Sequence, residues 1–205
     1  MNINEETIDT IKELINIGCG SGAGILNQMV KSHITLHVPS IRIIADRNIL
    51  DTYLKEYQKY QCVNVNIAGD LHGAISMLLT ESTLVVLVKR LTGEDALDDA
   101  IDGLKIEVIQ EIGNIILNSI SGTISNLFRL KINVSLPEFH NDIQSFITKK
   151  INEKDYSHYV LVETSMSVDD LNITFYIIIL LEADSFQYLI ENMDSISLFN
   201  FSKAN

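Results

Sequence analysis

Basic residues are scarce in this chain of 205 residues. Lysine and arginine total 15 against 27 aspartate and glutamate residues, and the formal net charge is −12. A protein that binds nucleic acid needs a basic face to offset the phosphate charge, and an anionic membrane surface makes the same demand. The composition therefore argues against nucleic-acid binding and against association with anionic membranes.

Cysteines and long apolar runs are also few. Cys19 and Cys62 show no close pairing, and the chain begins without a signal-peptide pattern, so we expect a reduced protein in the cytoplasm. The longest apolar run, ITFYIIILL at 173–181, is too short to cross a bilayer as a helix. Its β-branched and aromatic residues are typical of a buried strand, so no membrane insertion is expected.

The chain contains only two prolines, and their spacing reveals a repeat. Pro39 and Pro137 lie 98 residues apart. The same offset of 98 relates Glu13 to Glu111, Asn16 to Asn114 and Gly24 to Gly122. Such agreement at one spacing predicts an internal duplication. We expect a single domain over residues 1–205, made of repeats over about 1–98 and 99–205 that meet near the acidic stretch at 92–100.

Each repeat shows a similar order of expected elements. Helices are expected over about 4–29, 81–93, 102–128 and 184–193, and strands over 32–44, 63–69, 72–80, 131–139, 158–168 and 171–181. Because strands follow one another directly, antiparallel pairing is favoured. The predicted fold class is α+β, a duplicated helix–strands–helix unit with pseudo-twofold symmetry, a mainly antiparallel sheet and two long helices.

Four glycines near the N-terminus, at 18, 20, 22 and 24, raise the possibility of a phosphate-binding loop. No Gly-Lys-Ser/Thr follows them, and the apolar stripe of the first long helix continues through them, which favours an unbroken helix. A helical wheel puts Gly18, Gly22, Ile25 and Met29 on the buried side. It puts Glu13, Asn16, Gly20 and Ala23 on the polar side, and Glu111, Asn114, Asn118, Ser121 and Ser125 on the polar side of the second long helix.

These residues form a pattern that occurs twice: an acidic residue, x3, Glu, x2, Asn, x22, Pro. The first motif is Asp9, Glu13, Asn16 and Pro39, and the second motif is Glu107, Glu111, Asn114 and Pro137. The pattern resembles that of the CheC family of CheY-type response-regulator phosphatases, related to CheX and the flagellar-switch phosphatases, in which Asp or Ser is usual at the first position. The second motif departs from it there with Glu107. Length and duplication are most similar to CheC.

The resemblance implies a phosphatase that hydrolyses the aspartyl phosphate of a response regulator. It implies that Asn16 and Asn114 position the attacking water, that Glu13 and Glu111 anchor a lysine of the regulator, and that Asp9 and Glu107 support the contact. Pro39 and Pro137 would be structural. The enzyme would need no metal or cofactor of its own, since Mg²⁺ belongs to the regulator. Both motifs are expected to be competent, and the receptor deamidase CheD is a further possible partner.

Other interpretations remain open beside this one. A non-catalytic adaptor of a chemotaxis complex would bind a partner without hydrolysis, and a flagellar-switch component is less favoured because the chain ends at residue 205. His33 and His37 have a spacing that suits a metal only on a helix, and they fall in a stretch expected to be extended. Cys19 is read as a small helix residue.

Overall fold

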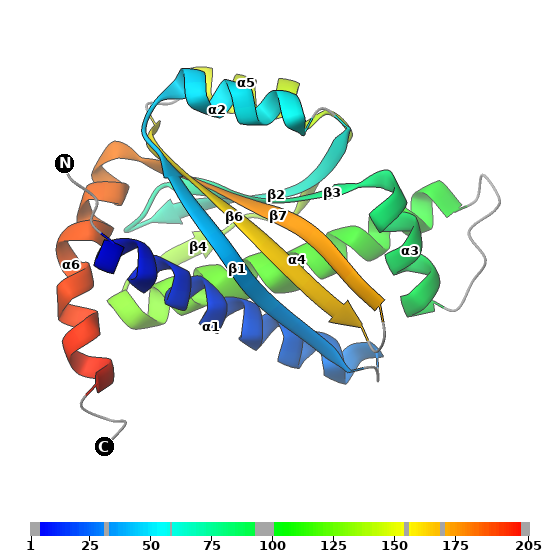
Figure 1. The fold of residues 1–205 in the computed structure, drawn as a ribbon, viewed down its shortest axis with the longest axis horizontal. Coiled ribbons are helices and arrows are strands. Elements are labelled where there is room, and N and C mark those ends of the chain that lie inside the picture. Colours follow the sequence, from blue (N-terminus) through cyan, green and yellow to red (C-terminus); the bar gives the residue numbers. More distant parts are fainter. Residues whose placement is uncertain are drawn as a thin grey trace.

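The structure is a computed structural model, and it describes residues 5–30, 33–57, 59–92, 101–153, 156–168 and 171–201. Six helices and seven strands are found in these residues (Figure 1). In chain order they are α1 (Glu5–Val30), β1 (Ile34–Ile44), α2 (Arg47–Glu56), β2 (Tyr60–Gly69), β3 (Gly73–Thr80), α3 (Glu81–Thr92), α4 (Ile101–Phe128), β4 (Ile132–Val134), β5 (Glu138–His140), α5 (Ile143–Glu153), β6 (Tyr156–Val168), β7 (Leu171–Glu182) and α6 (Ala183–Phe201).

One sheet contains all seven strands, in the order β1-β6-β7-β3-β2-β4, with β5 also paired to β2. Every pair is antiparallel. The α+β class and the antiparallel sheet predicted from the sequence are therefore confirmed. The expected junction at 92–100 falls almost wholly outside the described residues.

The strand order of the sheet is symmetric about the β3–β7 pair at its centre. The hairpin β2–β3 and the hairpin β6–β7 meet where β3 pairs with β7, and there Leu78 lies opposite Tyr176, which is 98 residues further along. Each remaining strand pairs with the hairpin from the other half of the sequence. β1 pairs with β6, whereas β4 and β5 pair with β2. Under the offset of 98, β6 and β7 correspond to β2 and β3, and β1 corresponds to β4 and β5. The order of corresponding strands is therefore the same from either edge of the sheet.

Helices cover both faces of the sheet. α1 and α4 lie on one face over a large apolar core, and α2 and α5 lie together on the other face over a smaller one (Figure 1). The sequence analysis missed α2 and α5. α2 begins after Asp46, whose carboxylate accepts a hydrogen bond from the Asn48 backbone N–H. The buried side chains of both helices are spaced four residues apart: Leu50 and Leu54, and Ile143, Ile147 and Ile151.

The two long helices, α1 and α4, cross in close contact at two glycines of α1. A Cβ on Gly18 would lie 2.7 Å from the Ile120 Cα, and one on Gly22 would lie 3.4 Å from the Ile116 Cα. The later residue of α1, Gly22, contacts the earlier residue of α4, Ile116, so the two helices run antiparallel. The helix thus continues through the glycines, which confirms that they do not form a phosphate-binding loop.

Four side chains of the two long helices face other directions than the helical wheel predicted. Ser121 of α4, expected on the polar side, is buried, and its hydroxyl donates to the Leu117 carbonyl. The other three lie on α1. Ala23, expected on the polar side, is buried, whereas Ile25 and Met29, expected to be buried, are exposed. The ideal wheel fails here because α1 packs against α4 as well as the sheet, which turns the buried face toward Gly22 and Ala23. The expected strand over 131–139 is also wrong in part, since it is broken into β4 and β5 by residues 135–137.

Candidate functional site

The first motif lies on α1 and reaches β1. Asp9 and Glu13 are exposed, and Asn16 is half-buried. The Asn16 Oδ1 accepts a hydrogen bond of 3.0 Å from the backbone N–H of Val38. Because a backbone N–H can only donate, the carbonyl oxygen of Asn16 must face the strand, and its NH₂ group points away from it.

This hydrogen bond satisfies a backbone N–H of the edge strand β1 at a register shift. The pairing of β1 with β6 shifts register between His37 and Ser40, so Val38 has no partner in the ladder there. Asn16 supplies one, and Asn27 of α1 accepts in the same way from the N–H of Ile34 at the start of β1. An edge strand left with unpaired N–H groups can pair with other chains. Asn16 therefore has a structural role that the sequence analysis did not foresee.

The second motif lies on α4 in a different setting. Glu107 and Glu111 are exposed and Asn114 is half-buried, as in the first motif. The Asn114 Oδ1, however, accepts a hydrogen bond of 2.6 Å from the side-chain amide of Asn118, one turn further along. In α1 the position equivalent to Asn118 is Gly20, where a Cβ would meet nothing within 4 Å. Two carboxamides can exchange donor and acceptor by rotation, so Asn114 is less constrained than Asn16.

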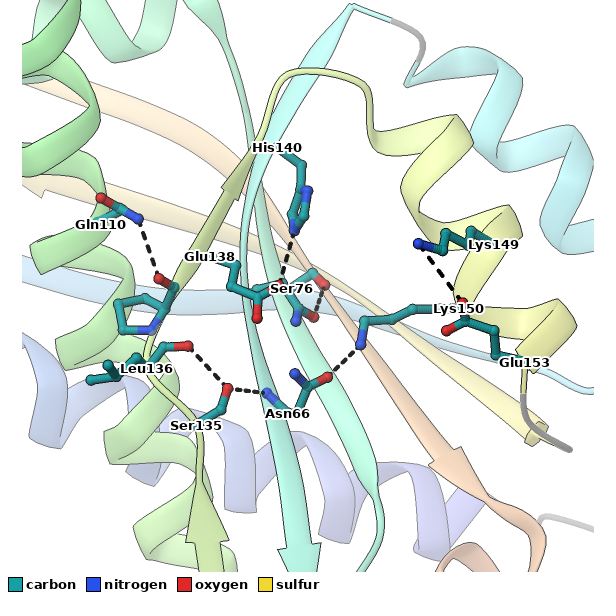
Figure 2. A network of polar contacts seen from close by, with 12 residues as sticks. Asn66, Ser76, Gln110, Ser135, Leu136, Glu138, His140, Lys149, Lys150 and Glu153 are labelled. Carbon is teal, nitrogen blue, oxygen red and sulfur yellow. Dashed lines mark hydrogen bonds and ion pairs between the residues drawn. The ribbon is translucent and has the colours of Figure 1, made fainter.

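The proline of the second motif is also held differently. Pro137 stands in the break between β4 and β5, and its carbonyl oxygen accepts a hydrogen bond of 3.2 Å from the side-chain amide of Gln110, shown in Figure 2. The residue before it, Leu136, is 86% exposed, whereas Val38, the residue before Pro39, is 0% exposed. Pro39 lies inside β1 at the register shift. No feature of the sequence distinguishes Leu136 from Val38, so this difference could not be predicted.

The two motifs do not form one composite centre. The helices cross midway between the Gly18–Ile120 and Gly22–Ile116 contacts, and each motif precedes that crossing on its own helix. Since the helices are antiparallel, Glu13 and Glu111 are separated by 14 residues of helix rise, or about 20 Å. Each Glu–Asn pair must therefore act alone.

Other candidate groups offer no competing chemistry in the described part of the chain. Burial raises the pKa of the Cys19 thiol to about 12, so it is protonated at neutral pH and is not a nucleophile. His37 lies in β1 and His33 directly before it, not on a helix. The described residues contain no group of three or more His, Cys, Asp or Glu side chains able to hold a metal ion. Among these residues there is also no helix that could span a membrane.

Comparison with known sequences identifies related proteins. Residues 61–160 match the family described as chemotaxis phosphatase CheX, and this span includes Glu111 and Asn114 but not Glu13 and Asn16. The chain is 24% identical over 170 residues to the CheY-P phosphatase CheC of Bacillus subtilis, which covers 80% of this chain and 81% of that protein.

Solved structures have the same fold. FliY of Thermotoga maritima superposes with a TM-score of 0.73 at 22% identity, covering 96% of this chain and 98% of that one. CheX from Borrelia burgdorferi, solved in a complex with CheY, BeF₃ and Mg²⁺, gives a TM-score of 0.50 at 18% identity over 85% of this chain and 99% of that one. In sequence the chain is therefore similar to the chemotaxis phosphatases CheX and CheC, and its fold is that of FliY and CheX.

Proposed function

We propose that this protein hydrolyses the aspartyl phosphate of a CheY-type response regulator. The observation that carries the proposal is the arrangement of each motif, in which an exposed glutamate precedes, by one turn, an asparagine whose carboxamide is held by a hydrogen bond. An exposed charge suits docking to another protein, and a carboxamide one turn away on the same helix suits the orientation of one water molecule.

The chemistry requires little from the enzyme beyond positioning. Water attacks the phosphorus, the bond between phosphorus and the aspartyl oxygen breaks, and inorganic phosphate leaves while the regulator recovers its carboxylate. Asn16 or Asn114 orients the water, since an amide both donates and accepts hydrogen bonds. Glu13 or Glu111 pairs with a lysine of the regulator, with Asp9 or Glu107 in support. The Mg²⁺ ion is bound by the regulator, and the buried thiol of Cys19 takes no part.

We also infer that the two halves are copies of one ancestral unit within a single domain. Three features support this inference: the offset of 98 in the motifs, the same offset between Leu78 and Tyr176 at the centre of the sheet, and the crossing of α1 and α4. In that crossing, adding 98 to Gly18 gives Ile116 and adding 98 to Gly22 gives Ile120, so the two contacts exchange under the offset.

The test is the decay of a radiolabelled, phosphorylated CheY-type regulator. Wild-type protein should accelerate decay, and the double variant Asn16→Ala/Asn114→Ala should lose about 100-fold of that acceleration, because water is no longer oriented. Asn48→Ala is the matched control, since Asn48 is exposed on α2 across the sheet. If the double variant and the control behave alike, the proposal is wrong. Binding without any acceleration would instead favour an adaptor, with a CheD-type deamidase as its partner.

A further inference from the structure

Each motif has one exposed aliphatic side chain beside its Glu–Asn pair. Among the described residues, seven large apolar side chains are exposed, and Leu136 exceeds all the others by a wide margin. Ile17, which is 41% exposed, directly follows Asn16 on α1. Isolated exposed apolar residues are common on proteins, so position and rigidity must decide whether these two matter.

Leu136 is held rigidly although its side chain lies in water. The backbone N–H of Ser135 donates to the Asn66 carbonyl at 3.0 Å, and the Asn66 N–H donates to the Ser135 Oγ at 2.9 Å. Lys150 of α5 in turn donates to the Asn66 side chain. On the other side of Leu136, Pro137 restricts the backbone of Leu136 to extended conformations. Binding therefore has to order only the side chain of Leu136, since its backbone is already fixed.

The residue that follows Leu136 is hydrogen-bonded to the helix that carries the second motif. This residue, Pro137, accepts the hydrogen bond from Gln110, which directly precedes Glu111 and lies one turn before Asn114 on α4. Figure 2 shows Leu136 projecting on the side from which Gln110 approaches, away from the cluster around Asn66 and Lys150. A partner seated on Glu111 and Asn114 would meet this side chain.

The first motif has the opposite arrangement. Its counterpart of Leu136 is Val38, which is fully buried, and its exposed aliphatic residue is Ile17 on the helix itself. The α4 counterpart of Ile17 is Ile115, which is only 8% exposed. Each motif therefore exposes a single aliphatic side chain at one of these two positions, supplied by the helix in one case and by the pre-proline residue in the other.

We propose that Ile17 and Leu136 are apolar anchors that dock the response regulator on the first and second motif, respectively. This inference rests on the proposed function. Each anchor lies near an exposed glutamate, Glu13 four residues before Ile17 and Glu111 beside Gln110. The complementary surface on the regulator is therefore an apolar depression next to a basic group, which matches the lysine assigned to the glutamate.

The experiment separates the two motifs by using a background variant for each. In Asn16→Ala protein, where only the second motif works, Leu136→Ala should raise KM about 5- to 10-fold and leave kcat within about twofold, because an anchor acts in binding. Leu136→Met should restore KM. In Asn114→Ala protein, Leu136→Ala should have no effect and Ile17→Ala should raise KM. Ile49→Ala is the control in both backgrounds, since Ile49 is an aliphatic residue on α2 that is 50% exposed.

An unchanged KM for Leu136→Ala in the Asn16→Ala background overturns the inference, and so does an equal effect in both backgrounds. Failure of the proposed function is recognised separately, because the Asn16→Ala/Asn114→Ala double variant would then hydrolyse as fast as wild type. In that case the anchors are tested by titrating a regulator activated with BeF₃. Leu136→Ala should still weaken binding about fivefold, and equal affinity would overturn the inference.

Discussion

Asn16 and Asn114 occupy equivalent positions of two long helices, yet their partners differ. The Asn16 Oδ1 accepts a hydrogen bond from the backbone of β1, whereas the Asn114 Oδ1 accepts one from the side-chain amide of Asn118. The difference begins in the strands, since β1 is continuous over 11 residues while its counterpart is broken into β4 and β5. Equal spacing in the sequence thus produces two sites of different rigidity, one braced by the sheet and one free to rearrange.

The largest expected effect concerns the residue before each asparagine. Ile15 is fully buried, whereas at Gly113 a Cβ would lie 2.8 Å from the Val63 Cγ1. Ile15→Ala should lower the free energy of unfolding by about 3 kcal/mol through the cavity that it leaves. Gly113→Ala should lower it by about 1–2 kcal/mol through overpacking. Urea unfolding measures both, and the exposed Ile17→Ala is the control. Equal midpoints for Ile15→Ala and Ile17→Ala would contradict the buried placement of Ile15.

The stability effect of removing each asparagine should differ next. Asn16→Ala leaves the N–H of Val38 without an acceptor and should lower the free energy of unfolding by about 1–3 kcal/mol. Asn114→Ala loses only a side-chain contact and should cost about 0.5 kcal/mol or less. Asn16→Asp keeps the acceptor but not the NH₂ group, so it should retain stability while losing hydrolysis through the first motif. If the two alanine variants are equally stable in urea, the contrast in bracing is wrong.

Much of the fold followed from the sequence, because the longest elements have the clearest patterns. The apolar stripe that passes through Gly18 predicted α1, and the consecutive strands expected over 63–69 and 72–80 predicted the antiparallel pair β2–β3. α2 and α5 were missed because each buries a short stripe of two or three residues. The hydrogen bond between Asn16 and Val38 joins a helix to a strand 22 residues further along, and the hydrophobic pattern carries no information about such a polar contact. The site residues were nominated from the sequence, but their partners were not.

The activities of the single variants should show a smaller difference. The hydrogen bond from the Val38 backbone holds the amide of Asn16 in one direction, whereas the amide of Asn114 can turn over by exchanging donor and acceptor with Asn118. We expect the second motif to be the faster one. Because each motif acts alone and the two rates add, Asn114→Ala should lower hydrolysis of the phosphorylated regulator about 10-fold and Asn16→Ala should lower it by only about a tenth. Single-turnover decay measures both. Equal losses, or a larger loss for Asn16→Ala, would mean that bracing by the sheet aids catalysis.

The smallest expected effect is at Gly20, the counterpart of Asn118. An added Cβ there meets nothing within 4 Å, so alanine keeps the helix and removes the conformational freedom of glycine in the unfolded chain. Gly20→Ala should raise the free energy of unfolding by about 0.5–1 kcal/mol. Gly18→Ala on the same helix should lower it, because its Cβ would lie 2.7 Å from the Ile120 backbone. Thermal unfolding of Gly18→Ala and Gly20→Ala measures both effects. It distinguishes Gly18, which allows α4 to pack closely, from Gly20, which leaves the surface beside the first motif without a side chain. A loss of stability in Gly20→Ala would mean that this surface is not open.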